Sequence, residues 1–228
     1  LNKSINELRA RNLFSNVSKT VYEGSTPSQK IVKIDIQEKA TGEISAGAGV
    51  GSDGTNFLFG VKENNWLGRG VAVDASVSVS TEKFFGSIAI SDPNYNFSGN
   101  RVFTNLSLGS TDTESTTGFK STKTGVALGT QFEQYEDIFF APSFDLSYEE
   151  ITTSSTASTS VKNMAGTFTN LDFNYSIVSD QRNQSYGTTD GYRMQFAQSL
   201  PLILDSAALS NIFKINSYHA LSDNIVGQ

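Results

Sequence analysis

Apolar and polar residues alternate strictly between residues 43 and 50. The apolar positions are Ile44, Ala46, Ala48 and Val50, and the positions between them are Glu43, Ser45, Gly47 and Gly49. A period of two is that of a β-strand with one apolar side. Residues 56–62 alternate in the same way, and the Gly- and Asp-containing segment 51–54 predicts a hairpin turn between the two strands.

The same alternation recurs along the chain and predicts about ten strands from residue 42 onward. The clearest run covers residues 138–149, whereas residues 212–221 are less regular and predict a change of phase near Ser217. Several runs reach about 9–12 residues, longer than the usual strand of about five or six. Two Ser/Thr-rich segments, 111–122 and 152–167, are predicted to be long exposed loops.

The first 40 residues follow a different pattern. Apolar residues at helical spacing predict a helix over 2–12, and two alternating stretches predict strands over 14–22 and 31–38. About 40 residues bury too little surface to fold alone. The chain opens directly on this α+β pattern without a secretory signal, so we expect a fragment of a longer protein.

The medium on the apolar side of the strands decides the fold. No window approaches the roughly 18 apolar residues of a membrane-spanning helix, but a membrane-spanning strand needs only about 9–11 residues, half of them polar. Long strands with one polar face therefore favour a transmembrane barrel over a soluble β-sandwich or solenoid. The barrel model predicts that apolar side chains point outward to lipid, as for Val73, Val77, Phe140, Phe144 and Phe173.

The sequence offers little catalytic chemistry. It has no cysteine and one histidine, His219, and its carboxylates show no metal-ligand spacing, so we predict no enzyme, no metal and no cofactor. The net charge of -6 argues against nucleic acid as a partner. The glycines of 47–51 resemble a phosphate loop only superficially, because they lie within a strand with no helix behind it.

Two features near the first hairpin stand out. A tight turn is predicted where a tryptophan would sit at the membrane interface, at Asn64, Asn65, Trp66, Leu67 and Gly68. The glycines at 47, 49 and 51 leave two interpretations open. They either make room for a bulky neighbour or form a deliberately weak edge strand.

These segments resemble the BamA family of outer-membrane assembly factors. The resemblance lies in TGEISAGAGVGSDGTNFLFGVKENNWLGRG, ISDPNYNFSGNRV, FNYSIVSDQRN and TTDGYRM, in that order. Upstream, SINELRARNLFSNVSKTVYEG and IVKIDIQEK resemble the back half of the family's last POTRA domain. The resemblance implies a mainly β fold, with an incomplete antiparallel transmembrane barrel at 41–228 and the C-terminal part of a POTRA domain at 1–40.

The resemblance also implies a function. Family members fold and insert other β-barrel proteins into the bacterial outer membrane without ATP, through a lateral seam at the first strand, here Glu43 to Val50. The implied partners are the lipid bilayer, nascent β-barrel substrates and accessory assembly lipoproteins, with the POTRA part in the periplasm. The alternatives are a related transporter that exports a polypeptide through its lumen and a passive outer-membrane barrel. Parity then predicts extracellular loops at 51–54, 81–83, 111–122 and 152–167, and periplasmic turns at 64–70, 92–99 and 179–190.

Overall fold

The computed structural model describes residues 2–11, 13–26, 28–51, 54–184, 187–203, 209–222 and 225–227. In chain order the elements are α1 (Asn2–Ala10), β1 (Phe14–Glu23), β2 (Lys30–Glu38), β3 (Gly42–Gly51), β4 (Gly54–Trp66), β5 (Val71–Ser80), β6 (Lys83–Asp92), a 3-10 turn (Tyr95–Phe97), β7 (Arg101–Thr113), β8 (Phe119–Tyr135), β9 (Ile138–Thr153), α2 (Thr159–Lys162), β10 (Gly166–Asp180), β11 (Asp190–Ile203), β12 (Ser210–Ser222) and β13 (Ile225–Gly227). Strands therefore make up most of the described chain.

α1, β1 and β2 form an N-terminal unit in which the helix packs on an antiparallel hairpin. Ile5 of α1 and Val17 of β1 are 3% and 2% exposed, and Arg9 donates a hydrogen bond from Nη2 to the carbonyl oxygen of Val17 at 2.8 Å. Both predicted strands are confirmed. The helix ends at Ala10, and the last residue predicted for it, Asn12, lies outside the described residues.

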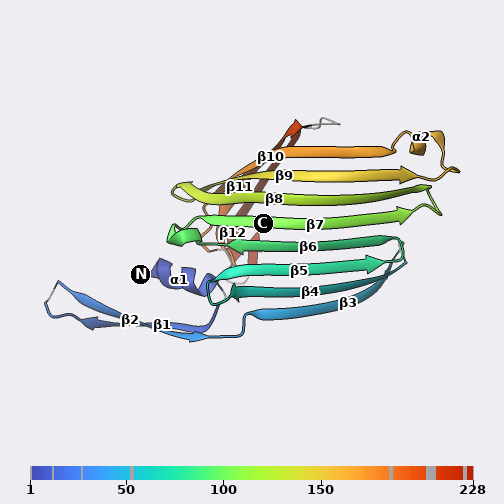
Figure 1. Cartoon of the computed structure of the whole chain (residues 1–228). Helices are drawn as coiled ribbons and strands as arrows, with labels where there is room; N and C mark the ends of the chain where they lie inside the picture. Colours follow the sequence, from blue (N-terminus) through green and yellow to red (C-terminus); the bar gives the residue numbers. More distant parts are fainter. Residues whose placement is uncertain are drawn as a thin grey trace.

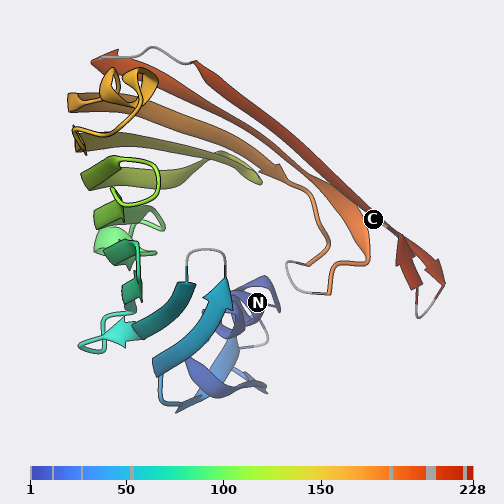
Figure 2. The same ribbon diagram turned by 90° about the vertical axis from the view of Figure 1, so that its right-hand side faces the viewer.

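β3 to β13 form one curved sheet in sequence order, with each strand antiparallel to the next (Figure 1). Seen along the strands, the sheet bends into an open arc (Figure 2). The N-terminal unit lies at one end of the strands, which we call the junction end, and α2 lies at the far end. The prediction of an incomplete antiparallel meander is confirmed.

One loop prediction is wrong. β7 and β8 pair from Arg101↔Gln131 to Thr113↔Phe119, so strands occupy most of the segment 111–122 and leave only a turn at 114–118. The physical reason is that threonine is common in exposed loops but is also a β-branched strand former, and Thr111 and Thr122 take strand positions. The other Ser/Thr-rich segment does contain a long connection, from 154 to 165, which includes α2.

The C-terminal strands also differ from expectation. β11 and β12 pair without interruption from Asp190↔His219 to Ser199↔Ser210, so the predicted change of phase at Ser217 is wrong. The irregularity lies later, between Ala220 and Ser222, where β12 pairs with β13. β13 is a strand of three residues that the alternation could not reveal, because a period of two needs more positions to be recognised.

Cross-strand pairing separates the two faces of the sheet. One row across β3–β10 is apolar and consists of Ile44, Val61, Ala75, Ile88, Leu106, Val126, Leu146 and Leu171. The adjacent row points to the opposite face and is small and mostly polar: Ser45, Gly60, Ser76, Ser87, Ser107, Gly125, Ser147 and Asn170. Neighbouring rows alternate because successive side chains of a strand point to opposite faces.

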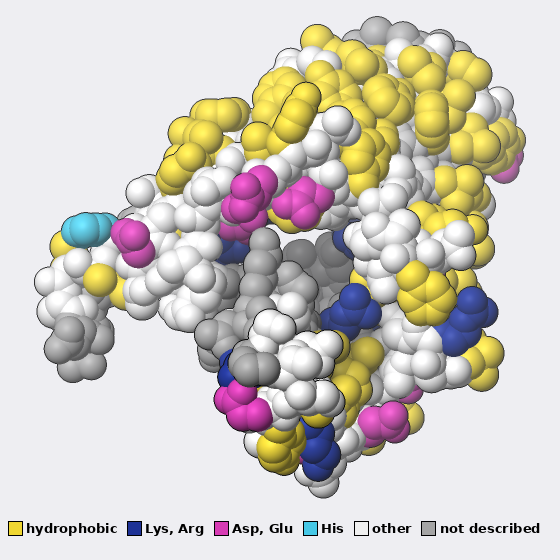
Figure 3. Space-filling view, turned by 90° about the vertical axis from the view of Figure 1, so that its left-hand side faces the viewer, with side chains coloured by type: hydrophobic (Ala, Val, Ile, Leu, Met, Phe, Trp, Pro, Cys, Tyr) yellow, Lys and Arg dark blue, Asp and Glu magenta, His cyan; other side chains and the backbone are white. Residues whose placement is uncertain are grey.

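The apolar face is the outer face. Figure 3 shows hydrophobic side chains gathered along the outer curve of the arc. The five side chains predicted to point outward all belong to this face, since Val73 and Val77 flank Ala75, and Phe140, Phe144 and Phe173 share the parity of Leu146 and Leu171. Within the part of the chain that the structure describes, the buried hydrophobic side chains are Ile5 and Val17 of the N-terminal unit. In the described chain, β3–β13 are therefore not held together by a buried core between two sheets, as the strands of a β-sandwich are.

Six aromatic side chains form a connected group on the outer face of β8–β11, which we call the aromatic panel. Ring centroids lie 5.7 Å apart for Phe132–Phe140, 6.0 Å for Phe140–Tyr175, 5.2 Å for Phe144–Phe173, 6.0 Å for Phe173–Tyr175 and 6.1 Å for Tyr175–Phe196. Offset and edge contacts at such distances stabilise aromatic pairs beyond their buried area. The panel thus joins four neighbouring strands through side chains as well as backbone bonds.

Candidate functional site

β3 is an edge of the sheet. Among the described strands its neighbour is β4, with pairing from Gly42↔Glu63 to Gly51↔Gly54. All ten of its residues are exposed, and Ile44 and Val50 on the outer face are 83% and 86% exposed. Its second edge therefore presents backbone N–H and C=O groups with no sheet partner in the described chain, and such an edge can pair with another strand.

The two halves of β3 have different surroundings. Near the junction end, the Ser45 hydroxyl lies over Gly60: a Cβ added to Gly60 would lie 2.7 Å from Ser45 Oγ. Toward the far end, a Cβ added to Gly47, Gly49 or Gly51 would meet no atom within 4 Å. No described neighbour therefore accounts for these three glycines, so the described chain offers no support for the interpretation that they make room for a bulky group. Residues 52 and 53 of the predicted hairpin turn lie outside the described residues.

The predicted tryptophan turn is a tight turn between β4 and β5. The N–H of Gly68 donates to the carbonyl of Asn65 at 2.9 Å, and the N–H of Gly70 donates to the Asn65 side-chain oxygen Oδ1 at 2.7 Å. Leu67, Gly68 and Gly70 all have positive φ angles, of 54°, 71° and 69°. Glycine is the residue that adopts this conformation at least cost, which explains its repetition after Trp66. The Trp66 side chain is 51% exposed.

A second turn at the junction end follows β10 and belongs to the FNYSIVSDQRN segment. The Arg182 guanidinium donates from Nε and Nη2 to the two carboxylate oxygens of Asp180, both at 2.7 Å. This bidentate hydrogen bond raises the pKa of Arg182 above its ordinary value. Asn183 continues the turn by donating to Thr189 Oγ1 at 2.6 Å. Sequence reasoning did not assign these roles, although an Asp–x–Arg–Asn run at a strand end is a recognisable turn-stabilising pattern.

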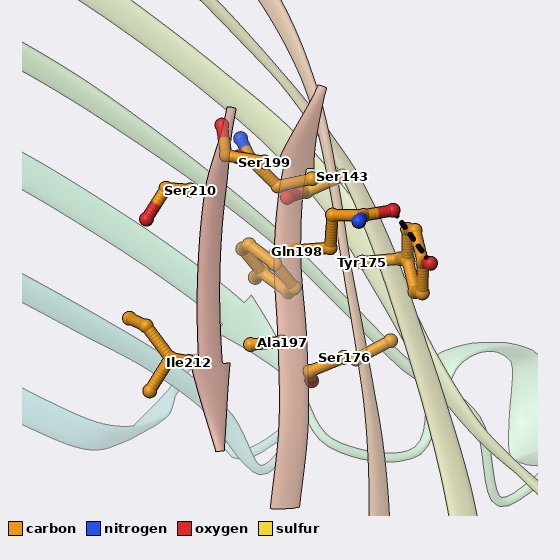
Figure 4. Close-up of a pocket in the computed structure, with 11 residues that line it drawn as sticks. Ser143, Tyr175, Ser176, Ala197, Gln198, Ser199, Ser210 and Ile212 are labelled. Atoms are coloured by element: carbon orange, nitrogen blue, oxygen red, sulfur yellow. Dashed lines mark hydrogen bonds between the residues drawn. The ribbon is translucent and has the colours of Figure 1, made fainter. Parts of the chain in front are cut away.

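A shallow hollow of about 270 Å³ lies at β9–β12 and is lined mainly by serine and alanine side chains (Figure 4). Ser210 and Ile212 project to one side of the strands there, and Tyr175 and Gln198 project to the other. Tyr175 Oη donates to Gln198 Oε1 at 2.8 Å, and Gln198 Nε2 donates to Asn211 Oδ1 at 2.6 Å. The hollow thus presents serine hydroxyl groups, and none of the described residues that line it is a histidine or a carboxylate that could act as a general base.

The chain carries few groups suited to covalent chemistry. In the described ranges, no group of three or more His, Asp or Glu residues is placed to hold a metal ion. His219 is exposed, with its Nδ1 atom 3.7 Å from Asp190 Oδ1 across β11–β12. No helix of the described chain is both long and apolar enough to cross a membrane.

The solved structures that resemble the chain include two that match nearly its whole length. BamA from Haemophilus ducreyi lacking POTRA domains 1–3 superposes with a TM-score of 0.66 at 16% identity, covering 97% of this chain and 46% of that one. CdiB from Acinetobacter baumannii superposes with a TM-score of 0.53 at 11% identity, covering 95% of this chain and 43% of that one. The likeness at these identities establishes the fold, and the chain spans less than half the length of either structure.

The family assignment rests on the sequence of the barrel strands. The model of the Omp85 superfamily domain matches residues 65–227, well over half of the chain. The match begins within the tryptophan turn, so it covers β5–β13 and leaves outside the N-terminal unit, β3 and all but the last two residues of β4. Omp85 proteins are β-barrels of the outer membrane, in agreement with the apolar outer face described above. The chain belongs to the Omp85 superfamily.

Proposed function

We propose that this chain is the seam-bearing part of an outer-membrane insertase, which folds and inserts β-barrel proteins by pairing their strands with the free edge of β3. The observation that carries the proposal is found in β3: it is the terminal strand of the meander, where a seam would lie, and three of its glycines touch no neighbour in the described chain. The proposed seam comprises Glu43, Ile44, Ser45, Ala46, Gly47, Ala48, Gly49 and Val50.

Physical chemistry explains why such an edge could work without a nucleotide or a catalytic group. An unpaired strand in lipid leaves backbone groups unsatisfied, at a cost of several kcal/mol each. A substrate strand that pairs with β3 satisfies both sets of groups, and the next substrate strand can then pair with the first. Insertion is driven by these hydrogen bonds and by the transfer of apolar side chains to lipid. We therefore propose a non-enzymatic activity without a cofactor.

We propose that residues 1–40 are the C-terminal part of a POTRA domain on the periplasmic side. The helix-on-hairpin structure supports this assignment, as does the direct connection from β2 to β3 through only residues 39–41. Val21, Val32 and Ile34 are 49%, 41% and 42% exposed, so the hairpin retains an apolar surface for nascent chains. Accessory assembly lipoproteins are the other partners proposed for this unit.

A related transporter that exports a polypeptide through its lumen is the second candidate. The likeness to CdiB and the row of small polar residues on the inner face favour it. The two functions place the moving polypeptide differently, since an insertase holds it at the edge of β3 and an exporter holds it against the inner face of the barrel.

A photo-crosslinking experiment separates these candidates. A photoreactive amino acid at Ser45 of the full-length protein should crosslink to a stalled β-barrel substrate during assembly, because Ser45 lies on the seam strand. The control is the same amino acid at Ser107, in the same inner-face row but four strands away. Efficient crosslinking at Ser107 with none at Ser45 would favour transport through the lumen.

A peptide tag tests the proposed orientation. The 154–165 connection lies at the far end of the strands, so a tag inserted after Ser155 should be accessible to antibody on intact cells. A tag inserted after Gln184, in the turn at the junction end, should become accessible only after the outer membrane is permeabilised. The reverse labelling pattern would place the N-terminal unit outside the cell and refute the orientation.

A further inference from the structure

The connection between the N-terminal unit and the barrel is held by a small network of hydrogen bonds. Thr41, the last residue before β3, donates from Oγ1 to Glu63 Oε1, and its carbonyl accepts hydrogen bonds from Asn64 N at 3.4 Å and Asn64 Nδ2 at 3.3 Å. Glu63 Oε1 also accepts from the N–H of Asn65 at 2.7 Å. We call Thr41, Glu63, Asn64 and Asn65 the junction clamp.

The junction clamp touches both parts of the chain. Asn65 holds the tryptophan turn through Gly70, and a Cβ added to Gly70 would lie 3.9 Å from Leu13 Cδ1 of the N-terminal unit. On the other side, the N–H of Lys39 donates to the carbonyl of Leu13 at 3.3 Å. The connecting segment is thus tied to the N-terminal unit at one end and to the barrel rim at the other.

A single oxygen is central to this network. Glu63 Oε1 accepts both the Thr41 hydroxyl and the Asn65 N–H, so it joins the segment before β3 to the turn after β4. Charge-assisted hydrogen bonds of this kind are stronger and geometrically more restrictive than neutral ones. Loss of that oxygen would remove both of these hydrogen bonds and leave the bonds made by Asn64 and the backbone pairing of β3 with β4.

We infer that Glu63, acting through Thr41, is a positioning residue that fixes the N-terminal unit relative to the junction end of β3. This inference rests on the proposed function, because its value to the protein is to deliver substrate strands from that unit to the edge in a constant direction. The two halves of β3 fit this role: the half near the junction end is clamped, and the far half carries the glycines without neighbours. The clamp therefore sets the direction of the edge while leaving the far half free to accept a partner.

Distance measurements on the full-length protein test the clamp without any substrate. Spin labels at Thr20, on the hairpin, and at Tyr95, on the rim of the barrel, report the position of the N-terminal unit. In the parent protein the distance distribution should be narrow. Glu63→Ala should remove the narrow peak and shift the distribution to longer distances, and Thr41→Val, which lacks the hydroxyl donor, should do the same.

Two further variants make the test specific. Glu63→Gln keeps one side-chain carbonyl oxygen able to accept both hydrogen bonds, so it should restore the narrow distribution. Glu133→Ala is the matched control, since Glu133 Oε1 accepts the N–H of Asp137 at 2.7 Å in a turn at the same rim that does not touch the N-terminal unit. Glu133→Ala should leave the distribution unchanged. Heat-modifiable gel mobility confirms that each variant has a folded barrel.

The outcomes separate the clamp from the proposed function. Unchanged distributions in both Glu63→Ala and Thr41→Val would overturn the clamp while leaving insertion at β3 intact. Broad distributions in both, together with slowed substrate assembly that Glu63→Gln restores, would support the clamp and its role. Broad distributions with assembly at the parental rate would overturn its role in delivery.

Discussion

A disulfide that locks the free edge of β3 should abolish substrate assembly by the full-length protein, and reductant should restore it. The lock joins a cysteine at Ser45 or Gly49 to a cysteine on the strand that closes the barrel. These sites suit the experiment because Ser45→Cys is close in size, and a side chain at Gly49 would meet no atom within 4 Å. A substrate strand needs the backbone groups that the closed seam occupies, so the expected effect is a loss of assembly to background.

The matched control is a disulfide between β5 and β6. Ser76 and Ser87 face each other there, with their Oγ atoms 3.0 Å apart, so cysteines at both positions can bond with little rearrangement. This seam lies within the sheet and has no role in accepting a strand, so its disulfide should leave assembly at the parental rate. If the variant locked at β3 also assembles substrates normally, the edge does not open and export through the lumen becomes the better account.

Arginine at a single outward position should destabilise the barrel strongly. Leu146 lies at the middle of β9 in the apolar row and is 47% exposed. Leu146→Arg places a charge in the hydrocarbon region, at a cost of about 2–4 kcal/mol near the bilayer midplane. Denaturant titration of the full-length protein in lipid vesicles, followed by heat-modifiable gel mobility, measures this loss.

The neighbouring residue provides the control. Ser147 belongs to the inner row, between Gly125 and Asn170, so Ser147→Arg should extend into the wet interior and change the free energy of unfolding far less. Equal losses for Leu146→Arg and Ser147→Arg would mean that the two faces meet the same medium, which contradicts the assignment of the apolar face to lipid.

Most of the fold was predictable from the alternation of apolar and polar residues along the chain. Residues 138–149 predicted β9 and its outward face because six apolar side chains share one parity. Composition was a poorer guide, since the Ser/Thr-rich segment 111–122 suggested a loop, but most of it lies in the paired strands β7 and β8. Threonine is common both in exposed loops and in strands, so the residue type alone does not distinguish the two. Only the presence of a paired neighbouring strand does.

The candidate site was predictable in part. The Gly-rich strand and the tryptophan turn were both recognisable from local sequence, and the structure places the turn at the end of β4, the strand that pairs with the Gly-rich β3. The junction clamp was not, because Thr41 and Glu63 are 22 positions apart and neither residue is unusual in its own segment. Their contact depends on the register of β3 with β4, which places Gly42 opposite Glu63.

The aromatic panel has a mechanical consequence for the whole wall. Across β8–β11, ring contacts resist changes in the angle between neighbouring strands, whereas the glycines of β3 offer no such resistance. The elastic compliance of the sheet is therefore uneven, low at the panel and high at β3. Under lateral pressure from the bilayer, deformation of the sheet concentrates where its compliance is highest, which is at β3. The distribution of aromatic residues and glycines along the sheet therefore determines which strand deforms first, whatever the source of the force.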